Sequence, residues 1–159
     1  MSESNEMYDI FISYQWGIQE QVAKFHKKLE LSTKYKIWRD ENALRQGTEG
    51  LYDQLAQNIN RSKVFLCFLT KKYIASPNCK RELEFAARIS KSIIYLMIEK
   101  MDVKKELVNA VGFIMGSANY THCYDNPESW WEDNFEEITN SLQTEIDVYI
   151  FILLIYFEV

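Results

Sequence analysis

The chain has 159 residues, of which 47% are hydrophobic and 26% are charged, and this composition fits one globular domain with a core of its own. Its net charge of −5 argues against sequence-independent binding of nucleic acid, because that binding needs Lys and Arg to displace phosphate counterions. The low counts of two prolines and five glycines argue against a linker-rich or disordered chain.

Strands and helices are predicted to alternate along the chain. The predicted strands are Tyr8–Tyr14, Tyr35–Trp38, Val64–Leu69, Ser92–Ile98 and Asn119–Cys123. The predicted helices are Gln19–Leu31, Leu51–Asn60, Asn78–Ile89 and Pro127–Gln143, whose apolar residues recur with a helical period. Residues 103–115 are ambiguous between a short helix and a loop.

Two of the strands, VFLCFL and SIIYLMI, are apolar throughout, which is typical of strands that are covered on both faces. Joined by helical crossovers, they predict a three-layer, flavodoxin-like α/β domain with helices on both faces of a five-stranded parallel sheet of order 2-1-3-4-5. We expect an N-terminal extension over residues 1–6, the domain over 7–145, and an apolar C-terminal tail over 146–159.

That tail contains an unbroken apolar run, Val148 to Phe157, followed by Glu158 and Val159. As a helix the run would measure about 15 Å, roughly half the thickness of a bilayer core, so we expect no membrane span. Three interpretations stay open: an added buried strand or helix, the beginning of a longer apolar segment, or an error in the gene model.

The cysteines do not predict a metal site. Cys67, Cys79 and Cys123 form no CxxC pair, and His26 and His122 are the only histidines, so no ligand cluster is visible. Cys67 lies in an apolar strand and is expected to be buried. Three unpaired cysteines favour a reducing, intracellular setting.

Several enzyme classes are excluded by missing motifs. The chain contains no GxGxxG, no GxxxxGK[ST] and no GxSxG sequence, which argues against dinucleotide-fold dehydrogenases, P-loop enzymes and hydrolases with a nucleophile elbow. The first and third strands end in SYQW and FLTKK, without the acids that a phosphorylated response regulator needs.

The remaining candidates follow the carboxyl ends of strands, where open α/β sheets place their sites. Trp16 or Tyr73 could stack on a flat ring, or could pack against the next helix. Asp40 could bind a ligand or form a turn. Glu82 could act as a catalytic carboxylate, or could only stabilise the start of a helix that Ser76 or Asn78 caps.

Four blocks in order resemble the Toll/interleukin-1 receptor (TIR) domain family: YDIFISY, IWRDENALRQG, VFLCFLT and YIASPNCKREL. The resemblance covers about residues 7–143 and is most detailed to intracellular modules of invertebrates and microbes that begin with a strand of the form ISYQW. It implies a cytoplasmic signalling domain of innate immunity that self-associates or binds other TIR domains through the loop Arg39–Gly50.

The resemblance also implies that Glu82 cleaves NAD⁺ at the nicotinamide–ribose bond, with NAD⁺ as substrate and no bound cofactor. Cleavage builds positive charge on the ribose, which a nearby carboxylate stabilises, as in glycosidases. Trp16, Asp40 and Tyr73 would help to hold the dinucleotide, although Trp16 stands where some NAD-cleaving relatives carry Arg. Glu84 would point elsewhere on the helix.

Two alternatives remain beside the enzyme. The chain could be a non-catalytic adaptor that acts only through contacts between TIR domains, with Arg39–Gly50 as its functional surface. More remotely, it could be an unrelated nucleotide binder of the same fold.

Overall fold

The computed structural model describes residues 6–41 and 50–157. Its strands are β1 (Tyr8–Ser13), β2 (Ile37–Arg39), β3 (Ser62–Leu69), β4 (Ser92–Met97) and β5 (Tyr120–His122). The longer helices are α1 (Gln19–Ser32), α2 (Leu51–Asn60), α4 (Pro77–Arg88) and α8 (Phe135–Phe157). The shorter ones are the 3₁₀ turn η1 (Trp16–Ile18), α3 (Lys71–Ala75), α5 (Val103–Glu106), α6 (Ala110–Met115) and α7 (Trp130–Asp133).

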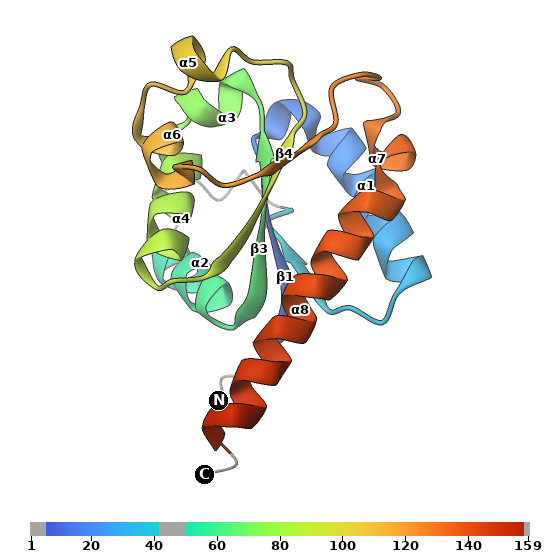
Figure 1. Cartoon of the computed structure of the whole chain (residues 1–159), viewed down its shortest axis with the longest axis vertical. Helices are drawn as coiled ribbons and strands as arrows, with labels where there is room; N and C mark the ends of the chain where they lie inside the picture. Colours follow the sequence, from blue (N-terminus) through green and yellow to red (C-terminus); the bar gives the residue numbers. More distant parts are fainter. Residues whose placement is uncertain (1–5, 42–49, 158–159) are drawn as a thin grey trace.

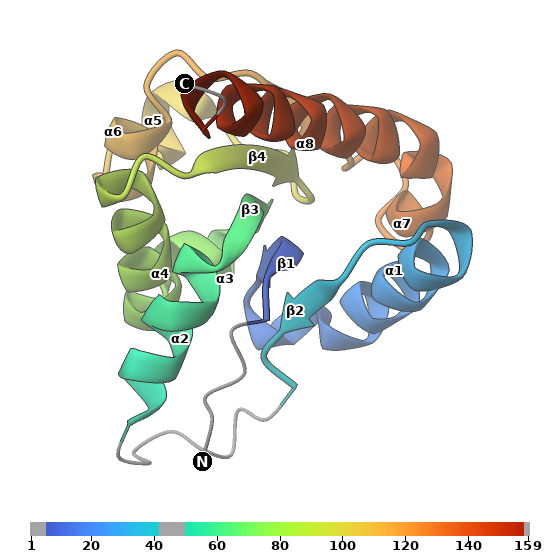
Figure 2. The same ribbon diagram turned by 90° about the horizontal axis from the view of Figure 1, so that it is seen from below.

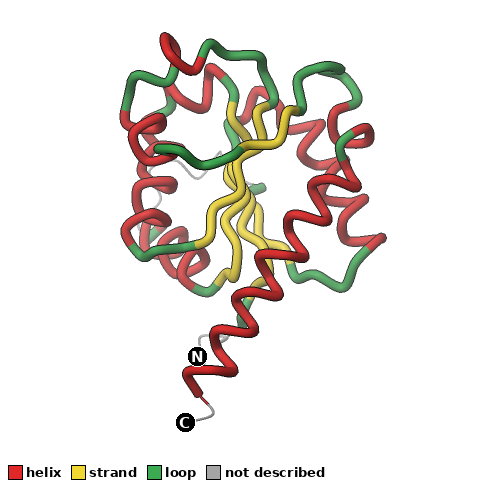
Figure 3. The backbone as a smooth tube through the Cα atoms, viewed as in Figure 1, coloured by secondary structure: helices red, strands yellow, loops and turns green. Residues whose placement is uncertain are grey.

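All neighbouring strands pair in parallel, in the order β2-β1-β3-β4-β5. The strands lie in the middle of the domain, with helices on either side (Figures 1 and 3). The predicted flavodoxin-like sheet and its strand order are therefore confirmed. Because the strands are all parallel, their carboxyl ends lie at the same edge of the sheet. The loops that follow the strands therefore gather at that edge.

Helices cover both faces of the sheet (Figure 2), and a hydrophobic core lies beneath them on each face. One lies under α1, α7 and α8, and the other under α2, α4 and α6. Successive residues of a strand point to opposite faces, so β3 contributes to both cores: Val64, Leu66 and Phe68 to the first, Phe65, Cys67 and Leu69 to the second. This double coverage explains why β3 is apolar from Val64 to Leu69 and why Cys67 is fully buried.

The segment between β3 and α4 contains the short helix α3, which is not among the helices predicted from the sequence. The hydroxyl of Thr70 accepts a hydrogen bond from the amide of Tyr73 and caps α3. Ser76 then caps α4 through a bond from the amide of Cys79, and Pro77 occupies the first turn, where no amide donor is needed. Of the two predicted caps, Ser76 and Asn78, Ser76 is the one that caps the helix.

The predicted helix Pro127–Gln143 is wrong at both ends. Only α7 and then α8 are helical, and Asn134 separates them, its side chain donating to the carbonyl of His122 at the end of β5 (3.1 Å). Helix α8 continues without a break through the apolar run to Phe157. The interpretation of that run as a buried element is also wrong, because nine of its ten side chains are exposed.

Candidate functional site

A cavity of about 370 Å³ opens at the carboxyl edge of the sheet. Its walls come from the segment after β1, from Asp40 after β2, and from the facing sides of α2 and α4. The residues that line it are Tyr14, Gln15, Trp16, Asp40, Leu51, Tyr52, Leu55, Ser76, Asn78, Cys79 and Glu82. Three of the four predicted site residues, Trp16, Asp40 and Glu82, therefore meet in one place.

Glu82 lies on the inner side of α4. Cys79, Leu83 and Ala86 share this face of the helix at spacings of three or four residues, and all three are buried. By contrast, Glu84 is exposed, as expected. A carboxylate on the apolar side of a helix is unusual, because burying a charge is costly unless other groups compensate it.

Ser13, the last residue of β1, compensates this charge. Its Oγ donates a hydrogen bond to Oε2 of Glu82 at 2.6 Å and lies 2.8 Å from the hydroxyl of Tyr73. Because a serine hydroxyl has one proton, Tyr73 donates to Ser13 whenever Ser13 donates to Glu82. The sequence analysis missed Ser13; its signal is a small polar residue directly after the apolar residues 10–12 of β1.

The environment raises the pKa of Glu82 from its ordinary value of 4.5 to about 7. Burial of the carboxyl group is the main cause; the hydrogen bond from Ser13 acts in the opposite direction, and the negative charge of Asp40 raises the pKa further. The carboxyl group is surrounded by protein although the residue as a whole is only half-buried. Near neutral pH, both the protonated and the ionised form of Glu82 are therefore populated.

Tyr14 contacts both Trp16 and Asp40, and so links the segment after β1 to the segment after β2. The hydroxyl of Tyr14 donates to the backbone carbonyl of Asp40 at 2.7 Å and accepts from Nη1 of Arg39 at 3.3 Å. The ring of Trp16 is stacked on that of Tyr14, with 6.3 Å between centroids. Trp16 is half-buried on the cavity wall, so one side of its ring is braced by the protein.

Tyr73 does not reach the cavity. Its side chain is fully buried in the core under α4, because the short helix α3 turns it inward. Direct stacking of its ring on a ligand would require the ring to leave that core. In this structure its contact with the site is indirect, through the hydroxyl of Ser13.

A second cavity of about 240 Å³ adjoins the first and shares Glu82, Asn78, Tyr52 and Leu55 with it. Arg81 lies in its wall, stacked over the ring of Tyr52 at 5.7 Å and donating to the hydroxyl of that residue at 3.2 Å. Glu82 thus lines both cavities, of which the second is almost entirely apolar, and Arg81 lines the second.

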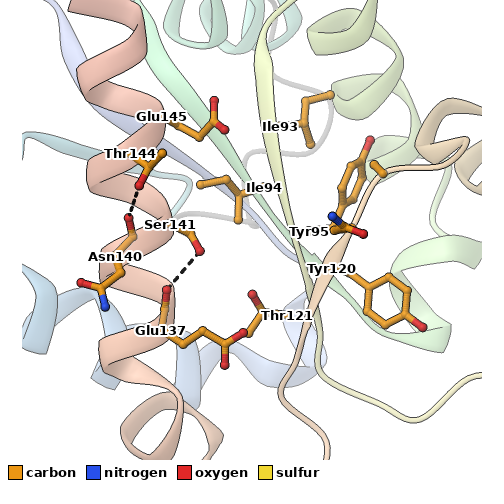
Figure 4. Close-up of a pocket in the computed structure, with 12 residues that line it drawn as sticks. Ile93, Ile94, Tyr95, Tyr120, Thr121, Glu137, Asn140, Ser141, Thr144 and Glu145 are labelled. Carbon is orange, nitrogen blue, oxygen red and sulfur yellow. Dashed lines mark hydrogen bonds between the residues drawn. The ribbon is translucent and has the colours of Figure 1, made fainter.

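A larger cavity, of about 640 Å³, lies between the β4–β5 edge of the sheet and α8 (Figure 4). Two carboxylates, Glu137 and Glu145, face it, and an anionic substrate would be repelled by them. The hydroxyls of Ser141 and Thr144 already donate to carbonyls of α8 itself. Although this cavity is larger than the one at Glu82, its carboxylates and its already bonded hydroxyls make it a poorer candidate for binding an anionic substrate.

Two further predictions concern metal binding and the assembly loop. Within residues 6–41 and 50–157, no group of three or more Cys, His, Asp or Glu could hold a metal ion. Most of the predicted assembly loop Arg39–Gly50, namely residues 42–49, lies outside the described residues. Its first residue, Arg39, is held by Glu41 (3.0 Å) and by Nδ1 of His26 (3.0 Å).

A family model described as TIR domain matches residues 10–139. Among solved structures, the chain is similar to the TIR domain of the Toll-related receptor TRR-2 from Hydra magnipapillata, with 20% identity, a TM-score of 0.59, and coverage of 84% of this chain and 99% of that one. It is also similar to the TIR domains of the activated Roq1 resistosome, which recognises the pathogen effector XopQ, with 14% identity, a TM-score of 0.53, and coverage of 89% and 81%. These two likenesses concern the fold. A comparison with curated proteins found no match.

Proposed function

Because the chain belongs to the TIR domain family, we propose that it is a signalling module that associates with other TIR domains and hydrolyses NAD⁺ at the nicotinamide–ribose bond. The observation that carries the enzymatic part is the position of Glu82. Glu82 lines a cavity at the carboxyl edge of the sheet, and its pKa of about 7 allows its carboxyl group to ionise near neutral pH.

The reaction asks for a negative charge beside the ribose. As the bond between the ribose carbon and the pyridinium nitrogen breaks, its electron pair leaves with nicotinamide and positive charge develops on the sugar. A carboxylate that is largely shielded from water by the protein stabilises this charge more strongly than the same group in water. Water then attacks the sugar carbon, giving ADP-ribose and one proton.

The remaining groups suit binding of the dinucleotide. Trp16 offers a braced aromatic face for a planar ring, and Arg81 at the adjoining cavity offers a cation for a phosphate. Asp40 lies close enough to Glu82 to raise its pKa, so it also influences the charge of the site. Tyr73 would not contact the dinucleotide, but would influence Glu82 through the hydroxyl of Ser13.

The assembly part rests on the family and on the predicted loop Arg39–Gly50. One relative of known structure is described as a resistosome. We propose that this chain likewise forms TIR–TIR contacts and that it works in the cytoplasm; its free, buried cysteines suit a reducing compartment.

The decisive experiment follows nicotinamide release from NAD⁺ by the purified chain, at several protein concentrations. Glu82→Gln should abolish release, whereas Glu84→Gln, two residues away on the exposed side of the same helix, should retain it. Absence of release from the unaltered chain at every concentration would favour the non-catalytic adaptor. Equal release from Glu82→Gln would leave the activity but remove Glu82 from it.

Assembly is tested separately by sedimentation of Arg45→Glu. Reversal of this charge should weaken self-association if the loop carries the contacts. Unchanged assembly would exclude the loop as the contact surface.

A further inference from the structure

The second half of α8 is an exposed apolar rod. From Val148 to Phe157 every residue is apolar, and exposure ranges from 38% at Leu153 to 80% at Phe157, with only Tyr149 half-buried. In Figure 1 this part of the helix extends past the end of the sheet. By length and composition, Phe135–Phe157 could cross a membrane, and 17% of its most apolar window is buried.

The helix changes character abruptly along its length. In its first half, Ile138, Leu142 and Ile146 recur every four residues and are buried against the sheet, while the other faces carry polar residues. After Asp147 this pattern stops, and apolar side chains occupy every position. The first half is therefore a normal surface helix of the domain, and the second half is not.

Apolar residues cover the whole circumference of the second half, because successive residues of a helix are about 100° apart. A protein partner that packs along one side would leave the other sides in water, where ten consecutive apolar residues are unfavourable. Bilayer hydrocarbon surrounds a helix on every side. We propose that Val148–Phe157 inserts into the hydrocarbon region of a lipid bilayer and attaches the domain to a membrane.

The dimensions and charges agree with this arrangement. The run is about 15 Å long, enough to cross one leaflet of a hydrocarbon core of about 30 Å. Asp147 directly precedes it, is exposed and would stay in water, and Tyr149 near its start suits the interface. Since the chain has a net charge of −5, attraction to anionic headgroups cannot supply the binding energy.

Insertion would leave the candidate site accessible. Helix α8 runs antiparallel to the strands, so its apolar end projects beyond their amino ends, whereas the cavity at Glu82 lies at their carboxyl ends (Figure 1). The membrane would then contact the end of the domain that faces away from Glu82.

The test is flotation of the full chain with phosphatidylcholine vesicles on a density gradient, with and without phosphatidylserine. The chain should float with both compositions. Phe151→Asp, Ile152→Asp, Leu153→Asp and Leu154→Asp place one charge on each of four sides of the helix. Each should lower the vesicle-bound fraction on the order of tenfold or more, because an acidic side chain is costly in hydrocarbon. Leu31→Asp, at a residue of α1 that is 80% exposed, is the matched control and should float normally.

Three results would overturn the proposal. The first is failure of the unaltered chain to float. The second is an effect confined to substitutions on one side of the helix, which would indicate a second copy of the chain or another protein as the partner. The third is an equal loss in Leu31→Asp, which would indicate non-specific adsorption.

Discussion

The ionisation of Glu82 depends on one buried hydroxyl, that of Ser13, and this dependence can be measured. Ser13 is 1% exposed and donates to Oε2 of Glu82 at 2.6 Å. Replacement by alanine removes a donor that favours the ionised carboxylate, so the pKa of Glu82 should rise above its value of about 7. Since the proposed reaction needs the carboxylate, the active form should then appear only at higher pH.

The magnitude follows from the strength of the lost bond. A hydrogen bond to a charged group contributes about 1.5–3 kcal/mol, which corresponds to about one to two pH units. At pH 7 about half of Glu82 is ionised in the unaltered chain, and about 1–10% should be ionised in Ser13→Ala. Activity at pH 7 should therefore fall by about fivefold to fiftyfold, and should recover near pH 10.

The assay is kcat/KM for nicotinamide release between pH 5 and 10, whose pH dependence reports the pKa of the free enzyme. Tyr73→Phe is the matched control: it removes the hydroxyl that contacts Ser13 but leaves Ser13 to donate to Glu82. It should shift the profile less than Ser13→Ala does. A loss of activity in Ser13→Ala that is equal at every pH would refute the reasoning, since it would indicate a purely structural role.

Three further predictions concern stability and binding. The pKa of Glu82 is higher in the folded state than its ordinary value, so the wild type loses stability as the pH rises from about 4.5 to about 7. In urea unfolding, Glu82→Gln should therefore be more stable than the wild type by about 3 kcal/mol at pH 8, and as stable as the wild type near pH 4. Gly112→Ala would place its Cβ 1.7 Å from the carbonyl oxygen of Leu107, and should lower the melting temperature in thermal unfolding by about 5–10 °C. In steady-state kinetics, Arg81→Ala should raise KM for NAD⁺ by less than about fivefold and leave kcat unchanged. The difference in KM between the variant and the wild type should shrink with added salt.

The fold was predictable because its signals are local. Uninterrupted apolar strands, helical periods between them and the absence of strand prolines lead to a covered parallel sheet, and the strand order followed the fold class. The break at Asn134 was not predictable in this way, because it depends on a hydrogen bond to His122 that exists only once the sheet has formed.

The site was predictable in part. Trp16, Asp40 and Glu82 share a cavity because each follows a strand that ends at the same edge. Ser13 and Glu82, in contrast, are 69 positions apart, and only the register of β1 and the rotation of α4 bring their oxygens together. Tyr73 faces the core because Thr70 starts a helix that is only five residues long, too short to produce a periodic pattern.

Membrane attachment and assembly of the domain are linked if both proposals hold. Confinement to a vesicle surface raises the local concentration of chains, so it favours any TIR–TIR contact without a new interaction. Because the apolar end of α8 and the cavity at Glu82 lie at opposite ends of the domain, attachment does not block the substrate. The rate of NAD⁺ cleavage per chain should therefore rise when phosphatidylcholine vesicles are added at low protein concentration. Leu154→Asp should remove this rise and leave the rate in solution unchanged. An equal rise in Leu154→Asp would mean that lipid acts on the enzyme by a route other than α8.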